Sequence, residues 1–172
     1  FSFMKLHIGG EQVKEGWKIL NIQKKDAVDF IGDISDLSQF DDDSIEEIYA
    51  SHVFEHVIQK KIKNTLIGIH RVIKENGKFY VSVPDMNILC KMFLEPKIPP
   101  KVKTQVLRMM FGGQVDDFDF HYFGWDYTLL ESYLLGCGFK KVEKVKSFSL
   151  FDDTSDYAPF SNIPISLNVI AY

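Results

Sequence analysis

Three residues in one short segment could do acid–base or metal chemistry. His52, Glu55 and His56 form a His-x-x-Glu-His pattern directly after the apolar run 48–50. Imidazole and carboxylate groups exchange protons and also bind metal ions. On a helix, His52 and His56 would share one face, as two zinc ligands must, and this order of residues is the signature of inverted zinc proteases. A zinc hydrolase that uses these three residues is therefore one interpretation.

The residues before this pattern favour a different context. Residues 45–50 form a predicted strand. In an α/β chain, a strand that ends in polar residues brings them to the carboxyl edge of the sheet, where such folds bind ligands. In that context His52 or His56 would contact a cofactor or an acceptor, and no metal is expected. A turn whose histidines only cap and pack is the third interpretation.

Two further segments carry candidate residues. Asp85 follows a predicted strand and a proline, so it could orient an acceptor or cap a helix that begins near Asn87. The loop 116–121 places three aspartates among aromatic residues. This loop could form a lid over an acceptor, in which case His121 is its best candidate for a base, or it could be a solvated loop that anchors its aromatic residues in the core.

The elements that must position these residues alternate along the chain. Predicted strands span residues 5–8, 18–22, 27–31, 45–50, 78–83, 139–145 and 165–171, and predicted helices span residues 58–73, 87–94, 101–111 and 128–137. This order predicts an α/β fold with a mostly parallel sheet, in one domain over residues 1–172. Residues 75–77, Glu-Asn-Gly, predict a turn that ends the first helix, and Thr128 with Glu131 has the spacing of a capping box.

The connection between the first two strands is too short for a helix. Only residues 9–17 lie between them, whereas a parallel crossover with its helix needs about a dozen residues. One face of the sheet is therefore expected to be thinly covered there. Exposed apolar faces of this kind often form interfaces, which predicts a homodimer through this face. Alternatively, Trp17 and the loop fold over the face and leave a monomer.

The composition narrows the partners and the setting. A net charge of −4 argues against nucleic acid as the main partner. Residues 26–47 contain nine acidic and no basic side chains, which favours a solvated acidic edge. Cys90 and Cys137 form no disulfide framework, so a reducing, cytoplasmic setting is expected. No apolar run approaches the length of about 20 residues that spans a membrane, so no membrane partner is expected.

Several segments together resemble a known family. They are residues 5–10, 16–17, 33, 50–56, 70–74 with Gly77, 81–85, 111–114, 121–125, 136–139 and 165–167. In their order and spacing they resemble a small S-adenosylmethionine-dependent methyltransferase of the Rossmann-like class I. The resemblance implies a seven-stranded sheet, mostly parallel, whose last strand is antiparallel, with S-adenosylmethionine across the carboxyl ends of the first four strands.

The resemblance also implies roles for particular residues. The cofactor-binding residues would be Gly9, Gly10, Glu11, Asn21, Asp33, Ile34, Ser51 and His52. Of these, Gly9 and Gly10 match the glycine loop, Asn21 the ribose position and Asp33 the adenine side. Asp85, Gln114 and Tyr122 would lie on the acceptor side, and the catalytic candidates are His52, His56 and His121.

Two positions depart from the pattern of the family. Glu11 stands where the glycine motif usually has its second glycine, and Asn21 stands where a carboxylate usually meets the ribose hydroxyls. These changes predict weaker cofactor binding, which Gly at 11 and Asp at 21 would restore. The predicted function is methylation of a small molecule, such as a sugar or other metabolite. A methyltransferase-fold binding protein without activity is the alternative, and a zinc hydrolase is the remote one.

Overall fold

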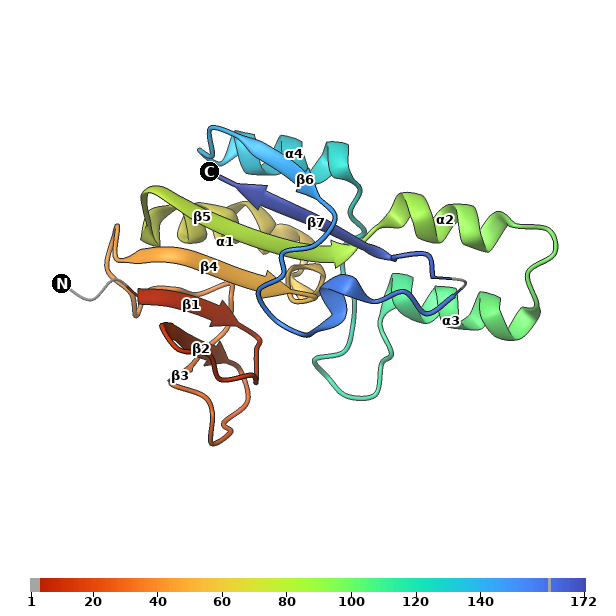
Figure 1. Cartoon of the computed structure of the whole chain (residues 1–172), viewed down its shortest axis with the longest axis horizontal. Coiled ribbons are helices and arrows are strands. Elements are labelled where there is room, and N and C mark those ends of the chain that lie inside the picture. The colour runs from red at the N-terminus through yellow and green to blue at the C-terminus, as the bar shows by residue number, and fades with distance from the viewer. Residues whose placement is uncertain (1–3, 161) are drawn as a thin grey trace.

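The computed structural model describes residues 4–160 and 162–172, and its centre is one mixed sheet. The strands are β1 (Met4–Ile8), β2 (Trp17–Asn21), β3 (Phe30–Ile31), β4 (Ile45–Ser51), β5 (Ile73–Pro84), β6 (Val142–Val145) and β7 (Ser166–Ala171). The seven strands lie in the order β3-β2-β1-β4-β5-β7-β6 (Figure 1). Strands β1 to β5 are parallel and β7 is antiparallel to both of its neighbours. The predicted α/β fold, with its last strand antiparallel, is confirmed.

The helices are unevenly distributed along the chain. They are α1 (Ile62–Val72), α2 (Met86–Leu94), α3 (Pro100–Phe111) and α4 (Tyr127–Gly136), with short 3-10 turns η1 (Phe54–His56), η2 (Gln59–Lys61) and η3 (Thr154–Asp156). Figure 1 shows α1 and α4 along one face of the sheet, whereas α2 and α3 extend beyond the carboxyl end of β5. Among the described residues, none of the helices has the length and apolar character needed to cross a membrane.

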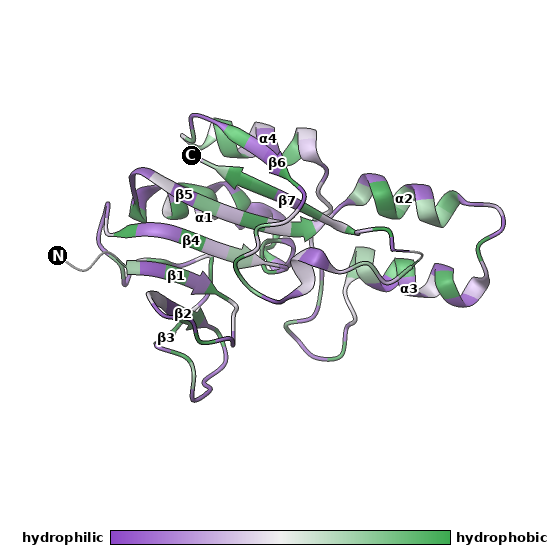
Figure 2. Ribbon diagram, viewed as in Figure 1, coloured by the Kyte–Doolittle hydropathy of each residue, from purple (hydrophilic) through white to green (hydrophobic). Residues whose placement is uncertain are grey.

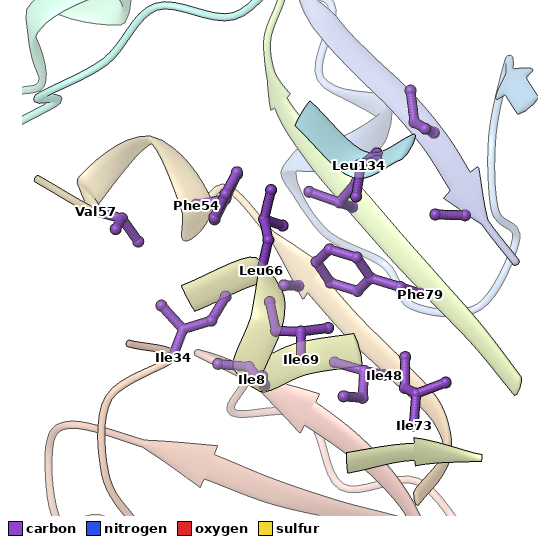
Figure 3. Packing of buried hydrophobic residues seen from close by; sticks show 14 of the residues in the cluster. Ile8, Ile34, Ile48, Phe54, Val57, Leu66, Ile69, Ile73, Phe79 and Leu134 are labelled. Carbon is purple, nitrogen blue, oxygen red and sulfur yellow. The ribbon is translucent and has the colours of Figure 1, made fainter. Parts of the chain in front are cut away.

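The main core lies between the sheet and α1. Apolar residues recur at the helical spacing in α1, so Leu66 and Ile69 are fully buried against Ile48 and Phe79 of the sheet (Figure 3). Figure 2 shows hydrophobic colour along nearly all of β7, whereas β1, β4 and the helices α2 and α3 mix hydrophobic and polar colour. This packing gives β1 and β4 a rigid support, and their carboxyl ends carry the candidate site.

Four element boundaries differ from the predictions by three residues or more, and one of them is the start of β6, at Val142 rather than residue 139. Strand β3 has only two residues, and α1 begins at Ile62, after η2, rather than at residue 58. Strand β5 already begins at Ile73. The predicted turn over residues 75–77 lies inside that strand as an irregularity, because Asn76 has a positive φ of 65° and the pairing with β4 shifts register there. A strong turn signal therefore marks a bulge within a strand here.

Among the described residues, two side chains cap α-helices at their N-termini. Asp126 is the N-cap of α4, and its carboxylate accepts a hydrogen bond from Leu129 N. The predicted capping box is therefore wrong, because Thr128 lies inside the helix and donates its hydroxyl to Asp126. Asp85 is the N-cap of α2 and accepts from Asn87 N, which selects the capping alternative for Asp85.

The face of the sheet opposite α1 is covered, although no helix lies between β1 and β2. Trp17 and Tyr49 pack there against Phe151. Figure 1 shows the segment that follows β6, to which Phe151 belongs, crossing this face of the sheet. Lys14 Nζ donates to Leu150 O, so the short first crossover is joined to this segment. The missing first crossover helix is confirmed, but the expected bare face is wrong. The argument for a homodimer through that face therefore no longer holds.

Candidate functional site

A cavity of about 350 Å³ opens at the carboxyl ends of the first strands. Its lining comes from the ends of β1, β2 and β4, from the turn after β3, from residues 52–61 and from the loop after α3. The residues that line it include Gly9, Asn21, Asp33, Ile34, His52, Val53, His56, Asp117, Phe118 and Tyr122. Parallel strands that end at one edge bring these distant residues together, as the strand-end interpretation of His52 predicts.

Gly9 shapes the floor of this cavity with its backbone. Its φ is +75°, and its N–H donates to Leu20 O at 2.8 Å. A Cβ at this position would lie 2.5 Å from Val53 Cγ2, so a side chain has neither the conformation nor the space. Gly10 is required for a different reason, since a Cβ there would collide with the His7 ring. Gly10 is buried and does not line the cavity.

Asn21 lines the cavity, but its amide group is already hydrogen-bonded. Its Nδ2 donates to Gly10 O at 3.2 Å, and its Oδ1 accepts from Gln23 N at 2.9 Å. The side chain is buried, so these two bonds hold the glycine loop against the end of β2. An amide makes both bonds, whereas a carboxylate could not donate to Gly10 O. The departure at this position therefore has a structural reason within the chain.

Glu11 lies outside the cavity lining. Its side chain is largely exposed and forms an ion pair with Lys25. The carboxylate therefore does not crowd the cavity. Asp33 and Ile34 do line it, and Asp33 Oδ1 accepts from Ser35 N at 2.9 Å, which leaves its other carboxylate oxygen for a ligand. Ser51, the last residue of β4, does not line the cavity.

His52 is held in an unusual backbone conformation directly after β4. Its φ is +52°, which is uncommon outside glycine, and its N–H donates to Ser82 O at 2.8 Å. The ring lines the cavity, and its Nε2 lies 2.8 Å from Ser166 Oγ. Ser166 donates its only hydroxyl proton to Thr154 O, so Nε2 of His52 is the donor in this contact.

Glu55 lies at the centre of a cluster of histidines. Its side chain is 1% exposed, and its Oε1 lies 3.3 Å from His52 Nδ1, 4.0 Å from His56 Nε2 and 3.9 Å from His121 Nε2. His52 and His56 come from the same segment, whereas His121 comes from the loop after α3. The structure therefore brings all three catalytic candidates to one buried carboxylate, although His121 does not line the cavity.

Burial and charge act in opposite directions in this cluster. Burial disfavours the carboxylate form of Glu55, but the close approach of His52 and the charges of the three histidines lower its pKa below the ordinary value. Burial lowers the pKa of His121, and the Glu55 charge only partly offsets this. The cluster therefore favours an ionised Glu55 beside a neutral His121.

The loop after α3 forms one side of the cavity, where the sequence predicts the acceptor. Asp117, Phe118 and Tyr122 of this loop line the cavity, and Tyr122 N donates to Glu55 O at 2.9 Å. Phe118 and Tyr122 are 54% and 45% exposed, so they are not core anchors. Neither Gln114 nor Asp85 lines the cavity.

The sequence analysis did not assign Glu55 to the methyltransferase-like site, nor Asp117 or Phe118. The sequence shows Glu55 as the acidic residue of the His-x-x-Glu-His pattern. The neighbouring residues do not indicate that a loop much later in the chain buries it. Asp117 and Phe118 belong to the loop proposed as a lid, but which of its side chains face the cavity depends on the turn that Asp119 stabilises through Gln114 N.

The comparisons with known proteins agree with this geometry. The methyltransferase domain family matches residues 4–81. A SAM-dependent methyltransferase from Archaeoglobus fulgidus superposes with a TM-score of 0.60 at 15% identity, over 98% of this chain and 85% of that one. One from Thermotoga maritima gives 0.59 at 15% identity, over 98% and 81%. A chain of the Haloferax volcanii complex between the Trm112 methyltransferase activator and a methyltransferase gives 0.56 at 13% identity, over 99% and 82%. No curated protein matches the sequence.

The fold and the strand-end cavity define a class I, S-adenosylmethionine-dependent methyltransferase fold. The fold implied by the resemblance is thereby confirmed over nearly the whole chain, and the methyltransferase domain family matches residues 4–81, a little under half of it. S-adenosylmethionine is the cofactor of that family, and the cavity fits such a group. Two residues that line the cavity suit a ligand of this kind. Gly9 has no Cβ to obstruct close approach to its backbone, and Asp33 uses only Oδ1 in its hydrogen bond to Ser35 N.

Proposed function

We propose that this chain is a methyltransferase that transfers the methyl group of S-adenosylmethionine to a small molecule, such as a sugar or other metabolite. The observation that carries the proposal is the cavity at the ends of β1 to β4, which Gly9, Asp33 and His52 line together. Gly9, Asn21, Asp33 and Ile34 would hold the cofactor. The two free cysteines support a reducing, cytoplasmic setting.

The bound cofactor would supply an activated methyl group, because the sulfonium takes the electron pair of the breaking S–C bond as the acceptor forms its bond to carbon. The protein's own task is mainly to orient the acceptor and exclude water. Phe118 and Tyr122 provide apolar and aromatic surface at the mouth of the cavity. His52 and His56 also line the cavity and could accept the proton of a hydroxyl acceptor.

The zinc hydrolase interpretation loses its structural context. That motif requires a long helix that aligns its two histidines, whereas only the 3-10 turn Phe54–His56 follows His52. His52 itself lies before this turn with a positive φ. A binding protein without activity remains the alternative, and the amide at Asn21, which is committed to the glycine loop, favours it over an active enzyme.

Calorimetric titration with S-adenosylhomocysteine, the demethylated product, tests the proposal. We expect binding, and about tenfold weaker binding for Asp33→Ala, because a hydrogen bond to a charged group is lost. Asp36→Ala is the matched control. Asp36 makes the same kind of turn, accepting from Ser38 N at 3.0 Å, but does not line the cavity. Absence of binding at millimolar ligand would contradict the proposal and favour the binding protein that has lost its cofactor.

A further inference from the structure

The buried carboxylate of Glu55 has no hydrogen-bond partner of good geometry. Both of its oxygens are fully buried, and among the residues that the structure describes neither has a hydrogen bond. A buried ionised carboxylate is costly unless its charge is compensated. The groups that surround Glu55 must therefore supply a cation, and the positions of their protons indicate which kind.

The protons of two histidines can be placed from their hydrogen bonds. His56 Nδ1 lies 3.0 Å from Phe120 O, and His121 Nδ1 lies 2.9 Å from Met109 O. A backbone carbonyl can only accept, so both Nδ1 atoms carry the proton. In the neutral rings each Nε2 is then a bare lone pair, and both Nε2 atoms face Glu55 Oε1, at 4.0 Å and 3.9 Å.

Three acceptor atoms, Glu55 Oε1 and the Nε2 atoms of His56 and His121, therefore face one another. Neither Nε2 carries a proton that it could donate to the carboxylate. We propose that Glu55, His56 and His121 bind one divalent transition-metal ion through Glu55 Oε1 and the two Nε2 atoms. This departs from the expectation of a site without metal, which rested on the strand before the pattern. Neither the fold nor the family comparison supplies this assignment.

The geometry suits an ion of this kind. The three donor atoms all lie within 4.8 Å of one another. Ligands bound to one tetrahedral zinc ion are roughly 3.4 Å apart, so each ring nitrogen must approach the carboxylate oxygen by roughly 0.5 Å and the two ring nitrogens must approach each other by up to roughly 1.4 Å, which rotations of the three side chains can supply. Two imidazoles and one carboxylate favour zinc or a neighbouring transition metal over magnesium or calcium.

The surroundings of the ligands also resemble those of metal-bound histidines. Metal ligands of this type usually donate their other ring nitrogen to a carbonyl or carboxylate, which fixes the tautomer and the ring. Phe120 O and Met109 O do this for His56 and His121. His52 differs, because its Nε2 donates to Ser166 Oγ while its Nδ1 lies 3.3 Å from Glu55 Oε1, so neither of its nitrogens has the arrangement seen in His56 and His121 and it is left out of the ligand set.

The ion would join two separate parts of the chain. Glu55 and His56 belong to η1, whereas His121 belongs to the loop whose residues line the acceptor side of the cavity. Metal binding would therefore fix this loop against the end of β4. His56 also lines the cavity, so the ion could bind the oxygen of a methyl acceptor there. That role alone would rest on the proposed function. Binding of the ion does not depend on it.

Titration of the chelator-stripped full chain tests this site, with Zn²⁺ followed by calorimetry and Co²⁺ followed by its visible absorption. We expect one equivalent to bind, and the Co²⁺ bands to show nitrogen and oxygen ligands. Glu55→Gln and His121→Asn should each weaken Zn²⁺ binding by about 100-fold, because each removes one of only three protein ligands. His70→Asn is the control, since His70 is exposed, contacts Phe139 and lies outside the cluster; it should bind as the wild type does.

Circular dichroism of the metal-free variants establishes that each is folded, and Glu55→Gln preserves the shape of the side chain if His121→Asn does not fold. The proposal would be overturned if no Zn²⁺ binds, or if the wild type, Glu55→Gln and His70→Asn bind it equally. The cluster would then be held together by hydrogen bonds and charge interactions without a metal ion. S-adenosylhomocysteine binding is measured on the same samples. Its loss in every sample with intact Zn²⁺ uptake would contradict the proposed function and not the metal site.

Discussion

The two halves of the candidate site are built in different ways. The cofactor half consists of strand ends and tight turns, and its polar side chains, Asn21 and Asp33, hydrogen-bond to the backbone of their own turns. The histidine half consists of side chains from two distant segments that meet at Glu55. The first half therefore depends on backbone conformation, and the second on which charges and lone pairs face one another. Substitutions should separate the two.

The strongest test of the cofactor half is a single methyl group at Gly9. Gly9→Ala places a Cβ 2.5 Å from Val53 Cγ2 in a residue with φ of +75°. The strained backbone and the overlap together should lower the free energy of unfolding by about 3 kcal/mol and abolish binding of S-adenosylhomocysteine. Urea unfolding and calorimetry measure the two effects.

Gly16→Ala is the matched control for this prediction. Gly16 has a similar φ of +81°, but a Cβ there meets nothing within 4 Å. It should therefore show only the backbone part of the cost, about 1 kcal/mol, and bind the ligand normally. Equal losses of stability in both variants would show that the overlap with Val53 is relieved by movement, and that the glycine loop is softer than the structure implies.

A second test compares two kinds of buried histidine. His7 packs against Tyr49 and Phe151, and burial lowers its pKa to about 4, with Asp153 only partly opposing this. The unfolded chain, with a pKa near 6.5, binds a proton that the folded chain does not. Stability that is present above pH 6.5 is therefore lost as the pH falls toward 4, by about 2 to 3 kcal/mol.

His7→Leu should remove this part of the pH dependence. Urea unfolding between pH 4 and pH 7 should give a clearly shallower slope for the variant than for the wild type, whatever the absolute stabilities are. An unchanged slope would mean that His7 accepts a proton in the folded state, with Asp153 as its partner. In the histidine half, by contrast, a carboxylate lies close by, because Glu55 Oε1 is 3.3 Å from His52 Nδ1.

The difference between the halves also explains what could be predicted from the sequence. The alternation of strands and helices and the polar end of the strand before His52 follow from local patterns, so the α/β sheet and the position of His52 were predictable, whereas the roles of Gly9 and Asp33 came from the family resemblance. The covering of the open face by Phe151 was not, because the segment 146–160 has no periodic pattern and its contact with Trp17 spans most of the chain. The meeting of His121 with Glu55 depends on a loop conformation in the same way.

The third prediction concerns Asn21, where the sequence alone indicates a lost carboxylate. Asn21→Asp would place a carboxylate oxygen against Gly10 O in a buried position, where Nδ2 now donates at 3.2 Å. We expect a loss of about 1 to 2 kcal/mol in the free energy of unfolding of the ligand-free protein. Tighter S-adenosylhomocysteine binding without loss of stability would show that residue 21 faces the ribose and not the glycine loop. Asn64→Asp, on the exposed surface of α1, is the control for the chemical change itself.

The smallest effect is expected at Glu11, although its departure from the glycine motif is the more conspicuous one in the sequence. Its side chain points away from the cavity and pairs with Lys25 at the surface, where ion pairs contribute little. Glu11→Gly should therefore change the free energy of unfolding by less than about 1 kcal/mol and leave S-adenosylhomocysteine binding within about twofold of the wild type. Lys25→Gly, which breaks the same pair from its other side, should match it. Clearly tighter binding in Glu11→Gly alone would mean that the carboxylate enters the cavity when ligand binds, and that the cofactor half depends on side chains after all.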